Sequence, residues 1–314
     1  MKNKTTQLSK GALTVSALAL ALASGVSQAA VLITQWSYST NAVFSDPTWT
    51  TGTGTTLSSP SELSWGSGAG DFQVPTNSST NRSALTVGDF SDTPESLTGG
   101  GPATGSVVTD ENGSLVGAEI GKGISLTHWN NVLDGSRATL TGARITDTIT
   151  LTPLVPAGGA SQNGPTLTFD FEFRETPNAG GAGGLCADGE SAVGFYGYSA
   201  AGGGCPDLFG YVNTQVVNQS FNYDGYTYFI SVLFLNPDGT LDTIGIPNLE
   251  DGECNALGLA NNCFGFRTLE TQETTKRFGF AISARPLPVP EPGTLALMGL
   301  ALAGMGAARY RKSS

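Results

Sequence analysis

The chain has 314 residues, including 43 glycines, and only 13% of its residues are charged, a composition that favours strands and turns over helices. Its formal net charge is −11, but once the six basic residues near the two ends and Glu291 are set aside, nine basic and 25 acidic residues remain, a net charge of −16. A field of this sign repels phosphates, so nucleic acid is excluded as a predicted partner.

The first 29 residues have the three parts of a signal peptide. Lys2, Lys4 and Lys10 precede an apolar stretch over 11–26, and Ser27-Gln28-Ala29 puts small residues where a signal peptidase reads them. We predict a signal helix over residues 1–29, with cleavage by signal peptidase after Ala29. The alternative is an N-terminal membrane anchor, for which the stretch is short, because a bilayer needs about 20 apolar residues.

Residues 30–286 are predicted to form one extracytoplasmic domain. Short apolar runs alternate with turn residues, which is typical of an all-β fold, and we expect an antiparallel β-sandwich of jelly-roll-like form. No helical periodicity is found outside the two ends. Segments 77–82 and 98–104 are expected to be loops, and 48–59 a loop or an exposed edge. The expected strands are Val31–Tyr38, Leu63–Gly66, Ile124–Trp129, Arg144–Thr152, Leu167–Phe173, Tyr226–Phe234, Leu241–Ile246 and Phe278–Ile282.

A distinctive string, Thr127-His128-Trp129-Asn130, ends one of these strands. His128 is the single histidine of the chain, and strand alternation puts it on the same face as Ile124 and Leu126. The favoured interpretation is structural: Thr127, His128 and Asn130 hydrogen-bond the backbone at the strand end. Ligand contact and catalysis are the alternatives, and a catalytic histidine would need an orienting partner.

The strand at Leu167–Phe173 carries carboxylates next to its apolar row. Laminarinase-type glycosidases carry a catalytic strand with the pattern Glu-x-Asp-x-x-Glu. Asp170, Glu172 and Glu175 resemble this pattern in their spacing, but the first two acids are exchanged. Because of the exchange, the side chain at the first position is shorter by about one methylene, and the placement of a catalytic carboxylate tolerates little error. The favoured interpretation is a strand whose acids face water.

Four cysteines, Cys186, Cys205, Cys254 and Cys263, predict two disulfides in an exported chain. Of the three connectivities we favour the local one, Cys186–Cys205 with Cys254–Cys263. The alternative is a four-cysteine zinc site, but the close Cys-x-x-Cys spacings of such sites are absent.

The last 28 residues, 287–314, combine three features in order. Pro290-Glu291-Pro292 is followed by an apolar run over 294–308 and by Arg309, Arg311 and Lys312, which the positive-inside bias keeps in the cytoplasm. This tail resembles the PEP-CTERM sorting signal. The resemblance implies processing by an exosortase in a Gram-negative bacterium that makes exopolysaccharide, with a short helix holding the chain briefly in the inner membrane. The alternative is an ordinary C-terminal anchor.

The string Thr127, His128 and Asn130 resembles the motif of the THxN family of PEP-CTERM proteins, and Glu175-Thr176-Pro177-Asn178 and the first cysteine pair are similar to other parts of that family. Leu63-Ser64-Trp65-Gly66 resembles exported choice-of-anchor domains. The resemblance implies export and surface sorting, and it supplies no catalytic residues.

The sequence therefore predicts a non-catalytic exported protein of the cell surface or extracellular matrix. The first alternative is a carbohydrate-binding module that uses exposed Trp65, Trp129 or tyrosines as stacking platforms for exopolysaccharide. The second is a glycosidase using Asp170 and Glu172. No metal site or cofactor is predicted; calcium is left open, although Asp-Gly pairs at 224–225, 238–239 and 251–252 are more typical of turns.

Overall fold

The computed structural model describes residues 30–67, 72, 81–90, 103–111, 120–197, 204–212, 218–243, 247–288 and 302. Contacts divide the chain into two units, a larger one of Leu32–Tyr223 with Thr227–Arg285, and a smaller one of Met1–Val31, Asp224–Tyr226 and Pro286–Ser314. In the smaller unit, the N–H of Leu287 donates to the carbonyl of Gly225 at 2.9 Å. Within the described ranges, no helix combines the length and apolar character needed to cross a membrane.

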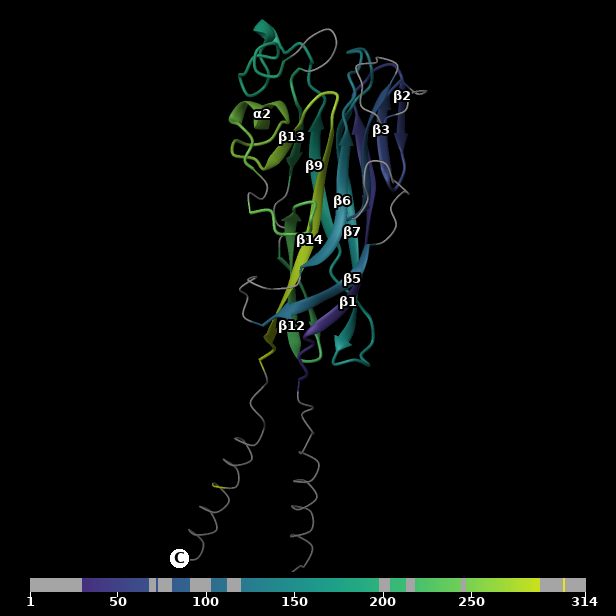
Figure 1. Ribbon diagram of the computed structural model, residues 1–314, viewed down its shortest axis with the longest axis vertical. Coiled ribbons are helices and arrows are strands. Elements are labelled where there is room, and N and C mark those ends of the chain that lie inside the picture. Colours follow the sequence, from purple (N-terminus) through teal and green to yellow (C-terminus); the bar gives the residue numbers. More distant parts are fainter. Residues whose placement is uncertain are drawn as a thin grey trace, which may run out of the picture. The chain divides into compact units, whose positions relative to one another are not determined.

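The larger unit is built from strands, which confirms the all-β prediction (Figure 1). In chain order the strands are β1 (Gln35–Trp49), β2 (Thr55–Ser58), β3 (Glu62–Gly66), β4 (Arg82–Asp89), β5 (Ala103–Asp110), β6 (Gly121–Trp129), β7 (Leu140–Val155), β8 (Gln162–Asn163), β9 (Leu167–Arg174), β10 (Asp207–Tyr211), β11 (Asn218–Tyr223), β12 (Tyr226–Leu235), β13 (Gly265–Thr268) and β14 (Glu273–Pro286). A short 3-10 turn covers Ala182–Gly184, and the α-helix α2 covers Asp251–Ala256.

The strands join into one large sheet in the order β13-β10-β9-β7-β1-β5-β14-β6-β4-β3-β2, with β11 and β12 attached through β14 and β8 through β7. The long strands β1 and β7 pair antiparallel along most of their length. The prediction of a purely antiparallel arrangement is wrong, because β5 pairs in parallel with β14, at Thr109 with Ile282. A strand that pairs antiparallel with β1 on one side and parallel with β14 on the other makes the sheet mixed.

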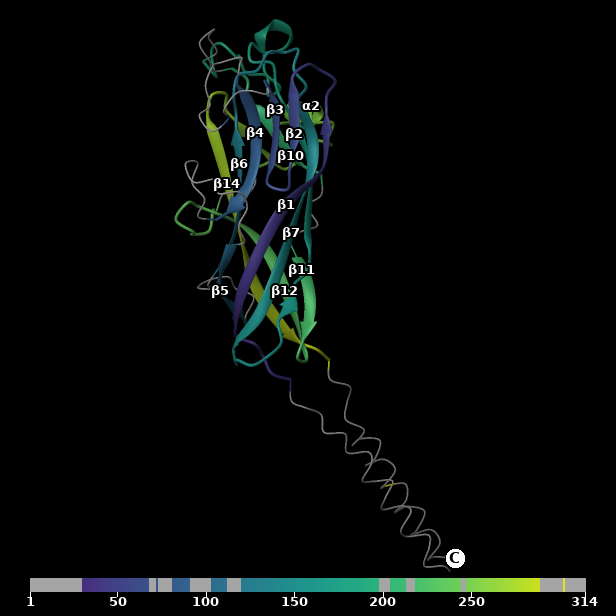
Figure 2. The same ribbon diagram turned by 90° about the vertical axis from the view of Figure 1, so that its right-hand side faces the viewer.

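The two parts of the sheet on either side of the β5–β14 pairing face each other. The ring of Trp65 on β3 lies 5.1 Å from that of Phe173 on β9, and Phe169 on β9 lies 6.3 Å from Phe278 on β14. In Figure 2, β6 and β14 lie on one side and β1 and β7 on the other. The alternating apolar residues of the strands form the core between them, where each fully buried large side chain stabilises the fold by about 1.5–3 kcal/mol.

Most of the predicted strands are present, with different ends. The first strand begins later than predicted and continues to Trp49, and the segment 48–59 ends in β2, an exposed edge strand. Residues 103–104, predicted as loop, begin β5, and Arg82 begins β4. The predicted strand Leu241–Ile246 is reduced, in its described residues, to a single bridge between Leu235 and Leu241. The two terminal helices lie outside the described residues, apart from Leu302.

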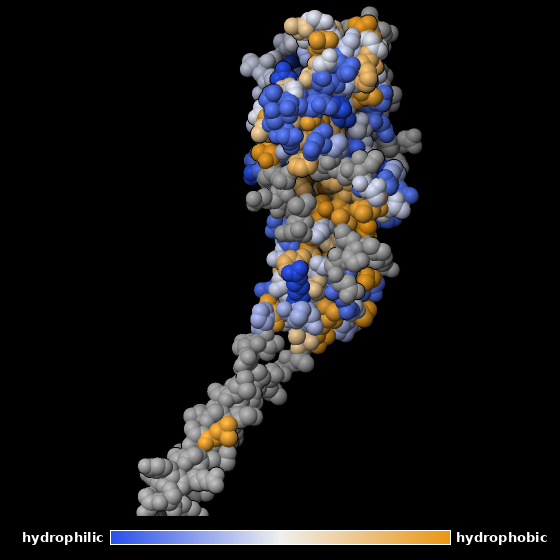
Figure 3. All heavy atoms as spheres, turned by 90° about the vertical axis from the view of Figure 1, so that its left-hand side faces the viewer, coloured by the Kyte–Doolittle hydropathy of each residue, from blue (hydrophilic) through white to orange (hydrophobic). Residues whose placement is uncertain are grey.

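The helix α2 was not predicted, because six residues are too few to show a helical period. Its start is fixed by a capping box, in which the side chains of Glu250 and Glu253 each accept a backbone N–H of the other residue. Asp251-Gly252, predicted as a turn, instead forms its first turn. Exposed polar residues surround the helix, and Figure 3 shows hydrophilic side chains gathered on this end of the larger unit.

Candidate functional site

The Thr-His-x-Asn string lies where β6 ends, between β4 and β14. The imidazole Nδ1 of His128 lies 2.7 Å from the hydroxyl of Thr268, and the amide Nδ2 of Asn130 donates to the carbonyl of Thr268 at 3.1 Å. Thr127 shares a hydrogen bond of 2.8 Å with the hydroxyl of Thr275. Only Asn130 therefore bonds a backbone group in the way the structural interpretation expected. The motif links the end of β6 to the end of β13 in the facing part of the sheet.

His128 is enclosed by aromatic rings. It stacks on Trp65, with ring centroids 5.7 Å apart and planes 19° apart, and the ring of Phe173 meets it edge-on at 5.1 Å. Only 1% of its surface is exposed. Burial without a charged partner disfavours the imidazolium and lowers the pKa of His128 from 6.5 to about 3. His128 is therefore neutral at physiological pH.

Three carboxylates gather at the ends of three adjacent strands. Glu175 directly follows β9, Asp207 begins β10, and Glu270 lies two residues after β13. Asp207 pairs with Thr268 in the sheet, and the next residue of β10 pairs with the last residue of β9, so the three ends coincide. One oxygen from each of Glu175, Asp207 and Glu270 lies within 4.8 Å of the other two. We call these three residues the acid cluster.

The acid cluster touches the motif and the core. The indole N–H of Trp65 donates to Glu175 at 2.8 Å. The side chain of Asn130 lies close to the carboxyl of Glu270, although no hydrogen bond of normal geometry joins the two among the described residues. The backbone N–H of Thr176 donates to one oxygen of Asp207 at 2.7 Å. The acid cluster and the Thr-His-x-Asn string therefore form one polar site at one end of the core.

The acid cluster is strongly desolvated. Burial raises the pKa of Glu175 to about 8, and burial followed by the charge of Glu175 raises the pKa of Glu270 to about 9. The pKa of Asp207 lies well above its usual range, first because it is buried and then because Glu175 and Glu270 are close. Each carboxyl group resists ionisation as long as no positive charge compensates it.

A pocket of about 330 Å³ opens onto this site. It is lined by Phe195, Tyr196, Gly204, Leu269, Glu270, Thr271 and Gln272. Glu270 is thus the member of the acid cluster that borders the open space, while Phe195 is 68% exposed at its rim. The pocket gives a small solute access to Glu270.

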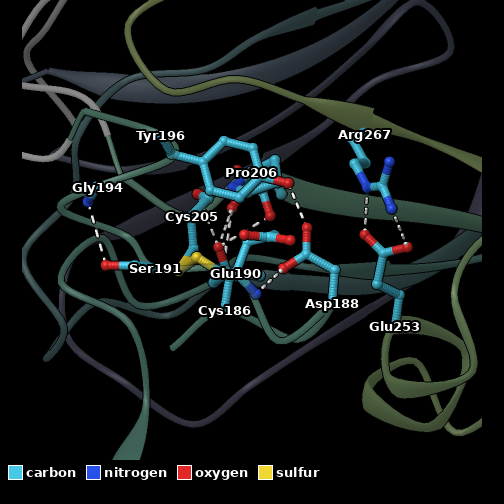
Figure 4. The surroundings of a disulfide bond; sticks show 12 residues. Cys186, Asp188, Glu190, Ser191, Gly194, Tyr196, Cys205, Pro206, Glu253 and Arg267 are labelled. Atoms are coloured by element: carbon cyan, nitrogen blue, oxygen red, sulfur yellow. Dashed lines mark hydrogen bonds and ion pairs between the residues drawn. A yellow bond between two sulfur atoms is a disulfide. The ribbon is translucent and has the colours of Figure 1, made fainter. Parts of the chain in front are cut away.

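The disulfide Cys186–Cys205 closes the loop that contributes Phe195, Tyr196 and Gly204 to the lining of this pocket. The hydroxyl of Tyr196 donates to Asp188, and Figure 4 shows this contact beside the disulfide. The hydroxyl of Thr176 donates a hydrogen bond of 3.0 Å to the carbonyl of Cys205, and Cys205 stands two residues before Asp207. The disulfide therefore fixes both the loop and the start of β10.

The second disulfide, Cys254–Cys263, closes the segment that carries α2. Both bridges match the local pairing that the sequence favours. On α2 the carboxylate of Glu253, only 1% exposed, accepts two hydrogen bonds from Arg267 of β13, at 2.5 and 2.9 Å (Figure 4). The helix is thereby tied to the strand that leads into Glu270.

Other predicted residues do not join the site. Asp170 pairs with Arg144 at 2.7 Å on the outer face of β9, whereas Glu175 meets Trp65 on the core side. The three carboxylates of the glycosidase interpretation therefore lie on opposite faces. Trp65 and Trp129 are both fully buried, which corrects the expectation that they form exposed stacking platforms. Glu172 lies on the outer face with Asp170.

The other two Asp-Gly pairs lie in turns. Gly225 and Asp224 both have positive φ values. In the turn that contains Asp238 and Gly239, Oδ1 of Asp238 accepts the N–H of Thr240 at 2.9 Å. Oδ1 of Asp238 thus bonds within the turn itself.

The sequence reasoning missed Asp207 and Glu270 and assigned Glu175 to a different site. A signal was available in the strand period. Glu175 continues the buried row of Phe171 and Phe173, and Glu270 continues that of Phe266 and Thr268. A carboxylate in step with a buried row is expected to point toward the core.

The predicted sorting residues lie outside the described part of the chain, as does the predicted signal peptide. Residues 288–312 match the PEP-CTERM protein-sorting motif, a range that contains Pro290, Glu291, Pro292, Arg309, Arg311 and Lys312. The chain carries a PEP-CTERM sorting signal. This signal indicates an exported protein that an exosortase processes. Among curated proteins, none matches the sequence significantly.

Proposed function

We propose that the chain is a non-catalytic component of the cell surface or extracellular matrix of a Gram-negative bacterium, and that it belongs to the THxN group of PEP-CTERM proteins. The PEP-CTERM match over residues 288–312 is the observation that carries this proposal. In this scheme the apolar run over 294–308 holds the chain in the inner membrane until the exosortase acts at Pro290-Glu291-Pro292. The two disulfides support a location outside the cytoplasm, because disulfides persist in oxidising compartments. The jelly-roll-like form of the domain remains part of this proposal.

The test is to replace Glu291 by Gln in the full chain and to follow the mass and location of the product. We expect the wild-type chain to lose its C-terminal tail and to reach the cell surface, and Glu291→Gln to keep the tail and stay with the inner membrane. Glu111→Gln, at an exposed position of the domain, is the matched control and is expected to behave as wild type. A wild-type protein that keeps its full tail in the producing cell refutes the proposal.

Binding of a surface carbohydrate is a second candidate function. It is favoured by Phe195, which is 68% exposed at the rim of the pocket and meets Tyr196 edge-on with centroids 4.9 Å apart. An exposed aromatic ring beside a pocket that also holds polar groups offers a flat apolar surface on which a sugar ring can stack. On a polysaccharide array, Phe195→Ala should lose any signal, whereas Val193→Ala, which removes an equally exposed apolar side chain, should keep it. No signal from the wild-type chain excludes this candidate.

A further inference from the structure

We propose that the acid cluster of Glu175, Asp207 and Glu270, together with the amide oxygen of Asn130, binds a hard divalent cation, and that Ca²⁺ is this cation in the exported protein. The inference goes beyond the proposed function, because it does not depend on how the chain is sorted. It rests on the geometry of the carboxylates, on oxygens that lack donors, and on the pocket that reaches them.

The first step is the lack of a compensating charge. Three carboxylates whose oxygens approach within 4.8 Å repel one another when ionised, and burial strengthens this repulsion. Among the described residues, none of the ion pairs includes Glu175, Asp207 or Glu270. A bound cation supplies the missing charge at the point where the three side chains meet.

The second step concerns Asn130, which is not an acid and is fully buried. Its Nδ2 donates to the carbonyl of Thr268, and this contact fixes the orientation of the amide, because the opposite orientation would bring two acceptors together. Its Oδ1 then has no hydrogen-bond partner in the described structure, although the side chain lies close to Glu270. A buried acceptor without a donor is costly, and coordination of a cation satisfies it.

The third step is the number and type of free oxygens. Oδ2 of Asp207 and both carboxylate oxygens of Glu270 also have no hydrogen-bond partner within the described ranges. The residues of the set offer oxygens alone, because the group whose ligand atoms come together consists of Glu175, Asp207 and Glu270 and does not include His128 or a cysteine. Oxygen ligands select Ca²⁺ or Mg²⁺ over zinc, and several protein oxygens in an irregular arrangement suit Ca²⁺ better than Mg²⁺, which keeps most of its waters.

The fourth step is access. Glu270 lines the pocket of about 330 Å³ together with Phe195, Tyr196 and Gly204 of the Cys186–Cys205 loop. Through this opening a hydrated ion can reach Glu270 and leave part of its water shell in the pocket. Asp207 and Asn130 then complete the coordination from the core side.

The experiment uses the full exported chain, freed of metal with EDTA and titrated with CaCl₂, MgCl₂ and ZnCl₂ by calorimetry and by thermal unfolding. We expect one Ca²⁺ per chain, with an apparent Kd at or below about 1 mM, the range of extracellular calcium sites. Ca²⁺ should raise the unfolding temperature, because it binds the folded state alone. Glu270→Gln should weaken Ca²⁺ binding at least tenfold. Glu172→Gln, on the outer face of β9, is the matched control and should bind as wild type.

Glu270→Gln keeps the size of the side chain and removes a repelling charge, so it should fold without added metal. A second readout does not depend on this variant. Tb³⁺ in the site should be sensitised by Trp65, which donates to Glu175 at 2.8 Å. Trp65→Phe should dim the Tb³⁺ luminescence far more than Trp36→Phe. The ring of Trp36 packs against Phe221, Tyr223 and Tyr228 rather than against the acid cluster.

Several results would overturn the proposal. One is the absence of heat, thermal shift and Tb³⁺ luminescence up to 10 mM metal (roughly ten times the expected Kd). Another is an equal response to Ca²⁺ in the wild-type chain and in Glu270→Gln. Binding of Zn²⁺ without binding of Ca²⁺ would also contradict it, because an oxygen site should not prefer zinc.

Discussion

Removal of the Cys186–Cys205 bridge should destabilise the chain by an amount set by the loop it closes. The two cysteines are 19 residues apart, and the chain-entropy relation gives about 3.3 kcal/mol for a loop of this length. Cys254 and Cys263 are 9 residues apart, for which the same relation gives about 2.7 kcal/mol. Double replacement by serine removes each bridge without leaving a free thiol.

The assay is equilibrium unfolding of the processed chain in urea, followed by tryptophan fluorescence, since buried Trp65 reports the core next to the site. Each double-serine variant should lose about 3 kcal/mol of unfolding free energy, with the larger loss for the Cys186 and Cys205 pair. That pair should lose somewhat more than the entropic value, because the carbonyl of Cys205 accepts the hydroxyl of Thr176 beside Asp207. A loss below about 1 kcal/mol for both variants would refute the reasoning.

Three further changes test the core, the ion pair and the buried histidine. Phe209→Ala should cost about 3–5 kcal/mol in urea unfolding, because Phe209 is fully buried and stacked; Phe264→Ala, at a 39% exposed ring, should cost far less. Arg267→Ala should cost about 2 kcal/mol, because it leaves the buried carboxylate of Glu253 without its partner; a loss near zero would contradict this. Because the pKa of His128 is lowered in the folded state, that state binds fewer protons than the unfolded state between pH 6.5 and about 3. The free energy of unfolding therefore falls as the pH falls through this window, by at most about 1.4 kcal/mol per pH unit. His128→Gln should lose this part of the pH dependence, measured by urea unfolding from pH 7 to 4.

The strands that could be predicted most directly are those whose buried and exposed side chains alternate. Along β7, the buried residues Ile145, Ile149 and Leu151 alternate with threonines that point away from the core, as a period of two requires. The turn after β12 was equally readable, since Asn-Pro-Asp-Gly fixes its backbone. Local patterns of this kind need no knowledge of distant partners.

The parallel pairing of β5 with β14 could not be predicted in the same way. It joins Thr109 to Ile282, 173 residues apart, through only two residue pairs, and nothing in either segment encodes the other. The helix α2 was missed for a different reason: its stability comes from the capping box and from Glu253 bonding Arg267 rather than from an apolar stripe.

The acid cluster lies between these two cases. Each of its members continues a buried row of its own strand, so the inward direction of Glu175 and Glu270 was readable from the period of two. That the three carboxylates meet depends on the pairing of β9, β10 and β13, which brings residue 175 beside Asp207 and Asp207 beside Thr268. The direction of each side chain was therefore predictable, and their meeting point was not.

Thr268 explains why the Thr-His-x-Asn string lies against this cluster. Its carbonyl accepts Asn130, its hydroxyl meets His128, and its strand partner is Asp207. The amide of Asn130 is thereby held with its Oδ1 lacking a hydrogen-bond partner among the described residues. Neutral His128 stacks on Trp65 and adds no charge that would compete with a cation. The string then forms one wall of the binding site, where His128 shapes the site and Asn130 contributes a ligand. Replacing Asn130 by Leu should therefore weaken Ca²⁺ binding. Replacing His128 by Gln removes no ligand and should preserve most of the Ca²⁺ affinity.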